Sequence, residues 1–167
     1  LSRVGAGPLQ YVLSALFVGL AIMLLIEALR EGSVSRDKVI AMLVLFTFNI
    51  LFWCFFEQAG SSFNFLAQNL VNRDLGGWEF PIGWFQSINP AGIVLLAPVM
   101  VAVWAMLGKA EPSIPRKFGL GHMGNALGFL VLMYALQNLV SADGQIPFWP
   151  LALCYVLQTF GELCLSP

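Results

Sequence analysis

Residues 50–65, ILFWCFFEQAGSSFNF, place Glu57 deep inside a long run of apolar side chains. A second run, residues 156–167, VLQTFGELCLSP, places Glu162 in the same kind of surroundings. A carboxylate at membrane depth costs about 2.5–3.5 kcal/mol on insertion scales, so such residues usually face a helix-bundle interior or a water-filled cavity. Both glutamates are therefore candidate functional residues, and they suggest a pathway for protons or a polar solute.

The composition of the 167-residue chain is that of a membrane protein. Apolar residues make up 59% of it and charged residues 10%, whereas soluble domains carry about 25% charged residues. A net charge of -1 without any basic run argues against nucleic acid as a partner. Cys54, Cys154 and Cys164 lie within apolar stretches without metal-ligand spacing, so we interpret them as small packing residues and expect no cofactor.

Five apolar stretches approach or exceed the length of about 20 residues that spans a bilayer. They cover approximately residues 9–29, 39–70, 85–107, 118–140 and 147–167. Backbone polar groups must be paired inside hydrocarbon, so these stretches are predicted to be helices of an all-α membrane protein. The second is longer than a bilayer requires, and we expect it to tilt or to project into water. Turn-rich loops separate the stretches: EGSVSRDK, NRDLGGWEFPIG, GKAEPSIPRK and SADGQIP.

Loop charge predicts the orientation in the membrane. The first and third loops are basic, with Arg30, Arg36 and Lys38 in one and Lys109, Arg116 and Lys117 in the other. The positive-inside rule places both in the cytoplasm. Three tryptophans then fall near the outer helix ends, as interfacial anchors do: Trp78, Trp84 and Trp149.

Polar residues form stripes on three of the stretches. The first stripe has steps of four, three and four residues, which share one face of a regular helix: Glu57, Ser61, Asn64 and Gln68. The other two polar sets are Gln158, Glu162 and Ser166, and Gln86, Ser87 and Asn89. We expect the three faces to converge on one cavity.

Other residues in these stretches have structural interpretations. Hydrogen bonding between helices, worth about 0.6 kcal/mol on average, is the interpretation we adopt for Asn49, Asn125, Gln137 and Asn138. Gly124 and Gly128 form a small-xxx-small pair that favours close helix contact.

Four segments in this order resemble the proton-dependent oligopeptide transporters of the major facilitator superfamily: FWCFFEQAGSSFN, WFQSINPAGIVLLAP, PSIPRKFGLG and FGELCLSP. The resemblance runs from about residue 36 to 167 and corresponds to that family's seventh to tenth transmembrane helices. It implies a bundle of two six-helix halves with alternating access. Residues 1–38 would be a linker helix and cytoplasmic loop between the halves. Residues 39–167 would be part of the C-terminal half, truncated at the C-terminus.

The resemblance also implies roles for individual residues. Glu57 matches a glutamate linked to proton coupling and to an ion pair with an arginine of the N-terminal half. Glu162 matches a glutamate that receives the amino terminus of the peptide, and Asn89 matches an asparagine that contacts the peptide backbone or terminus. The arginine belongs to the missing part of the same protein, which would comprise the N-terminal half and the last helices.

Three further residues complete the substrate site that the resemblance implies. Ser166 follows Glu162 by one helical turn near the cytoplasmic gate, and Trp53 and Phe56 match aromatics that line a side-chain pocket. Polar groups would hold the ends of the peptide while apolar walls accept varied side chains.

The expected function is proton-coupled symport of di- and tripeptides across the cell inner membrane. Its partners would be the peptide, protons as the coupling ion, and the lipid bilayer. Three alternatives remain: a same-fold carrier of nitrate or a modified amino acid, a non-transporting peptide sensor, and a membrane enzyme. The last is disfavoured because the sequence shows no Ser-His-Asp set, metal cluster or phosphate loop, and holds a single histidine, His122.

Overall fold

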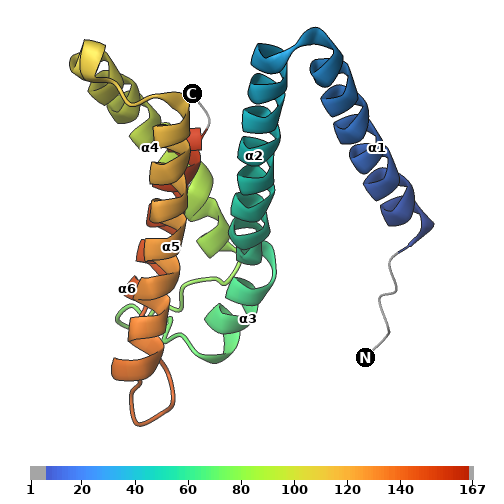
Figure 1. Ribbon diagram of the computed structural model, residues 1–167. Helices are drawn as coiled ribbons and strands as arrows, with labels where there is room; N and C mark the ends of the chain where they lie inside the picture. The colour runs from blue at the N-terminus through green and yellow to red at the C-terminus, as the bar shows by residue number, and fades with distance from the viewer. Residues whose placement is uncertain (1–6, 166–167) are drawn as a thin grey trace. The chain divides into compact units, whose positions relative to one another are not determined.

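The computed structural model describes residues 7–165 and is helical over most of them, with β contacts limited to two isolated bridges in this range. The elements in chain order (Figure 1) are α1 (Pro8–Glu31), α2 (Ser33–Phe56), the 3₁₀ turn η1 (Glu57–Gly60), α3 (Ser62–Asn69), α4 (Trp84–Leu107), the 3₁₀ turn η2 (Gly108–Ala110), α5 (Ile114–Asn138) and α6 (Trp149–Leu165). The chain divides into two compact units, residues 1–48 and 49–167.

Four helical stretches in the described part are long and apolar enough to cross a membrane: Pro8–Glu31, Ser33–Asn69, Trp84–Ala110 and Ile114–Asn138. They correspond to the first four of the five expected stretches. The fifth forms α6, which has 17 residues up to Leu165. Large apolar side chains on α1 and α4 are exposed, which is typical of helices that are apolar on all sides and face lipid.

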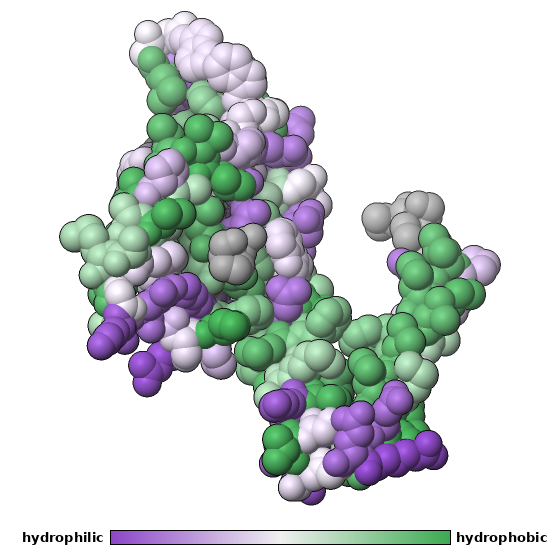
Figure 2. All heavy atoms as spheres, turned by 90° about the horizontal axis from the view of Figure 1, so that it is seen from above, coloured by the Kyte–Doolittle hydropathy of each residue, from purple (hydrophilic) through white to green (hydrophobic). Residues whose placement is uncertain are grey.

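In the first unit, α1 and the beginning of α2 run antiparallel and are joined at Gly32 (Figure 1). Gly32 has a φ of 121°, a conformation that side chains with a Cβ rarely adopt, so glycine permits this one-residue turn. The stretch expected to be a loop, EGSVSRDK, is therefore mostly helical, because α2 begins at Ser33. Charged residues gather at this turn between apolar helix surfaces (Figure 2), among them Arg36 and Lys38 in the first turns of α2.

The second expected stretch is not one continuous helix. It changes to a 3₁₀ turn at Glu57, and Ser61 leaves helical geometry with φ −129° and ψ −82° before α3 begins. Side chains pair with carbonyl groups near the break: the Gln58 amide donates to the Cys54 carbonyl at 3.1 Å, and the Asn64 amide donates to the Gly60 carbonyl at 3.2 Å. Such pairing is what makes a helix break tolerable at membrane depth.

The backbones of α5 and α6 lie close together because glycines face each other between them. A Cβ added at Gly124 would lie 2.9 Å from the Leu157 carbonyl oxygen, and one added at Gly161 would lie 2.6 Å from the Gly121 carbonyl oxygen. At Gly128 the nearest atom would be the Cys154 sulfur, at 3.0 Å. The close helix contact expected from the glycine spacing is therefore confirmed.

The core of the second unit surrounds α6. The Tyr155 ring centroid lies 5.7 Å from that of Phe63 on α3 and 6.2 Å from that of Phe85 on α4, separations at which aromatic pairs stabilise each other. Cys154 and Cys164 are buried, as expected for packing residues. Cys54 is exposed, so the packing interpretation is wrong for that cysteine within this unit.

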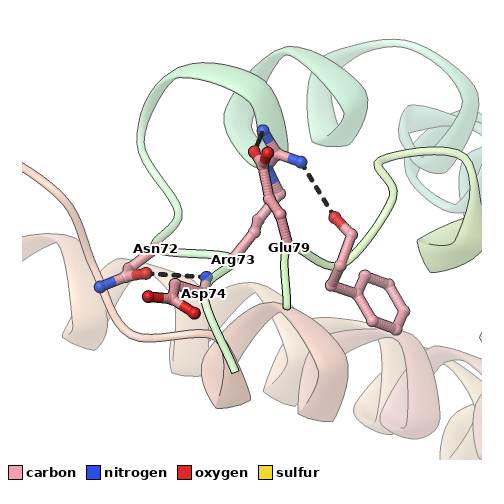
Figure 3. Close-up of polar contacts among 5 residues, drawn as sticks. Asn72, Arg73, Asp74 and Glu79 are labelled. Carbon is pink, nitrogen blue, oxygen red and sulfur yellow. Dashed lines mark hydrogen bonds and ion pairs between the residues drawn. The ribbon is translucent and has the colours of Figure 1, made fainter. Parts of the chain in front are cut away.

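The connection between α3 and α4 is ordered by its own polar groups (Figure 3). Arg73 pairs with Glu79 at 2.5 Å and donates to the Phe80 carbonyl oxygen at 2.9 Å. The Asn72 side chain accepts a hydrogen bond from the Asp74 backbone N–H at 2.9 Å, which tightens the turn. Backbone bonds then attach this connection to the one between α5 and α6, with the Ile146 N–H donating to the Leu70 carbonyl at 2.7 Å.

Candidate functional site

A cavity of about 170 Å³ lies where the break after α2 meets α4 and α6. Its lining residues come from three places in the sequence: Phe56, Glu57, Ala59 and Gly60 beside the break, Gln86 and Asn89 on α4, and Tyr155 and Gln158 on α6. Residues from all three polar stripes therefore line one cavity, as the sequence predicted.

Asn89 links α4 to the carboxylate of α6. Its Nδ2 donates to Oε2 of Glu162 at 2.8 Å and to the Thr159 hydroxyl at 3.1 Å. That hydroxyl in turn donates to the Tyr155 carbonyl at 2.8 Å. An ionised carboxylate accepts hydrogen bonds through both oxygens. The bond from Asn89 occupies Oε2 of Glu162 and so fixes the orientation of the carboxylate, which leaves Oε1 to accept a bond from another donor.

Glu57 is the first residue of η1, and its side chain is exposed and lines the cavity. A 3₁₀ turn in the middle of a helix often marks a position that moves. Neither Glu57 nor Glu162 forms an ion pair with the residues that the structure describes. The charge of each carboxylate is therefore available to a ligand or to another cation.

The predicted polar stripe on the second stretch is divided by the helix break. Glu57 lines the 170 Å³ cavity, whereas Gln68 lines a different hollow of about 360 Å³ beside the Arg73 connection. The expectation of one continuous stripe is wrong because it assumed 3.6 residues per turn across residues that do not keep this geometry.

The two predicted pocket aromatics lie at different distances from the cavity. Phe56 lines it, while Trp53 contacts Phe56 edge to face with ring centroids 5.2 Å apart and is not among the lining residues. Ser166, the third residue expected beside Glu162, lies outside the described residues.

Sequence analysis placed Gln158 on a polar face expected to meet the cavity but gave it no individual role, and its side chain does line the cavity. Gln158 is 1% exposed, and its Nε2 donates to Oδ1 of Asn125 at 2.9 Å. Asn125 in turn donates to the Phe52 carbonyl oxygen at 3.3 Å, which confirms its expected role as a hydrogen-bonding residue between helices. The four-residue spacing to Glu162 was the available signal, because it places both side chains on one face of α6.

The sequence matches the POT family over residues 12–167. The chain belongs to the POT family. It is 39% identical over 166 residues to a peptide transporter of Yersinia enterocolitica, covering 97% of this chain and 32% of the relative. It is also 31% identical over 157 residues to dipeptide and tripeptide permease B of Yersinia enterocolitica, covering 93% of this chain and 32% of the permease.

The structure gives the same result. A crystal structure of a peptide transporter POT in complex with sulfate matches with a TM-score of 0.81 and 33% identity, over 94% of this chain and 32% of that one. The chain thus spans about a third of the length of the relatives that it matches. The predicted family and the predicted all-α membrane fold are both confirmed.

Proposed function

We propose that this chain forms part of the C-terminal half of a proton-coupled symporter that carries di- and tripeptides across a cell inner membrane. Residues 1–38 then form the linker between the halves, and residues 39–167 belong to the second half. The N-terminal half and the last helices of the same protein complete the site. The proposal is supported by the peptide transporter and the dipeptide and tripeptide permease that match over nearly all of this chain.

The Asn89–Glu162 hydrogen bond is the observation that carries the proposal. The amino terminus of a peptide is a cation at neutral pH, and a carboxylate binds it through charge-assisted hydrogen bonds. A carboxylate that is oriented in advance loses less conformational freedom when the ligand arrives. Glu162 is held in this way by Asn89 at 2.8 Å, so the pair is suited to an ammonium ligand.

Glu57 takes up the coupling proton in this mechanism. An ionised Glu57 pairs with a cation of the N-terminal half, and protonation removes the charge that maintains the pair. The bundle is then free to change its opening. The position of Glu57 on η1, between two helices that are not continuous, allows this local change to act on the helix geometry.

The remaining predicted residues shape the substrate site. Phe56 lines the cavity, and Trp53 packs against its ring, so together they provide an apolar wall for peptide side chains. Ser166 stays part of the proposal as a polar group one turn after Glu162.

The test is uptake of labelled dialanine into liposomes that carry the full-length protein, with and without an inward proton gradient. We expect accumulation that depends on the gradient and is abolished in Glu57→Gln. Exchange of internal for external dialanine without a gradient should persist in Glu57→Gln, because a neutral side chain resembles the protonated state. Glu162→Gln should lose both uptake and exchange.

Gln137 on α5 is exposed, and its side chain makes no hydrogen bond among the described residues, so its expected role between helices is wrong. Gln137→Leu is therefore the matched control and should transport like the wild type. If folded protein takes up no dialanine under any gradient, peptide transport is refuted. Uptake of nitrate or a modified amino acid would then identify a carrier of another solute. Peptide binding without any flux would instead identify a sensor.

A further inference from the structure

The hydrogen bonds from Gln158 through Asn125 to Phe52 have a fixed direction. The Phe52 carbonyl oxygen can only accept, so Asn125 must present its Nδ2 to it, at 3.3 Å. Asn125 then presents Oδ1 to Gln158, which must offer its Nε2, at 2.9 Å. With Asn125 only 4% exposed and Gln158 1% exposed, water does not compete for these groups. The remaining atom of the Gln158 amide, Oε1, is therefore fixed as an acceptor.

This acceptor has no partner. Oε1 of Gln158 is buried and makes no hydrogen bond within the described structure. More than nine in ten buried polar groups in proteins are paired, so an unpaired one calls for a partner, either a water molecule or a donor that arrives in another state. Gln158 and Glu57 both line the 170 Å³ cavity, so the side chain with the unpaired oxygen and the proposed proton site border one small volume.

Two of the donors that line the cavity, the Tyr155 hydroxyl and the Asn89 amide, already have other acceptors. The Tyr155 hydroxyl donates to the Ala59 carbonyl at 3.1 Å, and Nδ2 of Asn89 donates to Glu162. Gln86 lines the cavity from α4, but its side chain is exposed. An ionised Glu57 would bring only acceptors towards Oε1, whereas a protonated Glu57 brings one O–H donor.

The titratable groups near this position come from each surrounding helix. On α6 they are Cys154, Tyr155 and Glu162, and on α5 the group is His122, whose Nδ1 lies 2.9 Å from the Phe118 carbonyl oxygen. From α4 only amides line the cavity. Glu57 is the carboxyl group that lines the cavity, and protonation converts it from an acceptor to a donor.

We propose that the protonated carboxyl of Glu57 donates a hydrogen bond to Oε1 of Gln158, with Asn125 as the positioning residue that fixes this oxygen as the free acceptor of the amide. This inference rests on the proposed function, in which Glu57 carries the coupling proton. The proton comes from the aqueous phase, stays on Glu57, and leaves when the carboxyl ionises and turns away. Gln158 and Glu162 are one turn apart on α6. Protonation of Glu57 would therefore change a contact of the same helix that carries Glu162, the residue proposed to bind the amino terminus of the peptide.

The first experiment measures the pH dependence of gradient-driven dialanine uptake by the full-length protein in liposomes. In Gln158→Leu the protonated state loses its acceptor, so protonation needs a higher proton concentration. We expect the pH of half-maximal uptake to become more acidic by about one unit, a tenfold loss in proton affinity, equivalent to about 1.4 kcal/mol. Gln158→Met keeps a similar length and should shift in the same direction. Gln137→Leu should not shift.

The second experiment observes the hydrogen bond itself. Infrared difference spectra between high and low pH give the carbonyl stretch of the protonated Glu57, identified by its absence in Glu57→Gln. We expect the wild-type band at a hydrogen-bonded frequency and a move to higher frequency in Gln158→Leu. Asn125→Ala should cause part of the same move, because the Gln158 amide is then free to turn. A role limited to packing would change neither the band nor the uptake midpoint.

The outcomes separate this inference from the proposed function. If Glu57→Gln keeps gradient-driven accumulation, the proton site is wrong and the inference fails with it. If Glu57→Gln is uncoupled while both Gln158 variants keep the wild-type midpoint and band, only the inference is overturned. If neither Gln158 variant folds, a free-carboxyl frequency for Glu57 in the wild type overturns it.

Discussion

Replacing Gly161 with alanine tests the close packing of α5 and α6. The added Cβ would lie 2.6 Å from the Gly121 carbonyl oxygen, and that oxygen belongs to the backbone of a helix. A carbon and a carbonyl oxygen in close contact are normally about 3.3–3.6 Å apart. The two backbones must therefore separate by about 0.7–1.0 Å, because neither atom is on a flexible side chain.

The cost follows from this separation. A radial gap of about 0.5–1 Å removes between a quarter and a half of the contact attraction of the atoms that line it. Overpacking of a well-packed core typically costs about 1–3 kcal/mol. The unfolding entropy grows with chain length at about 2.1 cal/mol/K per residue, and the full-length relatives are about three times as long as this chain. In the full-length protein the thermal midpoint of Gly161→Ala should therefore fall by roughly 1–3 °C.

The assay is thermal unfolding of the full-length protein in detergent, followed by tryptophan fluorescence. Gly124→Ala should also lower the midpoint, because its nearest atom is a backbone oxygen at 2.9 Å. Gly128→Ala should lower it less, since the Cys154 sulfur at 3.0 Å can move with its side chain and the nearest backbone oxygen is farther away, at 3.2 Å. The control is Gly119→Ala on α5, where the added Cβ has nothing within 4 Å and the midpoint should not fall. Equal midpoints for Gly161→Ala and Gly119→Ala would refute the reasoning.

Other contacts predict effects that can be measured in the same protein. Asn89→Leu should raise the KM for dialanine by roughly 10- to 100-fold, because a hydrogen bond to a charged group such as Glu162 is worth about 1.5–3 kcal/mol, and a normal KM would contradict the orienting role. Tyr155→Phe should cost about 0.5–1.5 kcal/mol of stability by leaving the Ala59 carbonyl without this donor, measured by thermal unfolding against the wild type. Arg73→Gln should speed proteolysis of its connection, since the ion pair and the bond to the Phe80 carbonyl are both lost, and unchanged cleavage would show that the connection is held elsewhere.

Helix positions were predictable from the sequence where strong boundary signals exist. The third and fourth expected stretches, 85–107 and 118–140, form α4 (Trp84–Leu107) and α5 (Ile114–Asn138). Gly108 ends the first of these with a φ of 49°, and Pro115 near the start of the second is compatible with a first helical turn. Length and apolar character decide such helices because the bilayer requires both.

Other features depend on contacts that a sequence pattern does not contain. The beginning of α2 was missed because Gly and Ser normally indicate a loop, whereas here Gly32 alone makes the turn. The break covers residues 57–61, EQAGS, which hold no proline. Gly60 and Ser61 were the available signal for a kink, but hydrophobic periodicity alone could not locate it. The Oε1 of Gln158 is unpaired because the amide must donate to Asn125 on α5, which itself donates to the Phe52 carbonyl on α2. These contacts join three helices, so the residue spacing within α6 could not predict them.

The glycine contacts also restrict the degrees of freedom of this unit. Sliding α5 along α6 by one residue, a rise of about 1.5 Å, would bring side chains such as those of His122 and Asn125 against the Gly161 backbone. The glycine contacts therefore favour one register between the two helices. This register also sets the position of Glu162 on α6 relative to α5. Regular helical hydrogen bonding is interrupted around η1, which makes that segment the natural hinge between the α2 end and the α5–α6 pair.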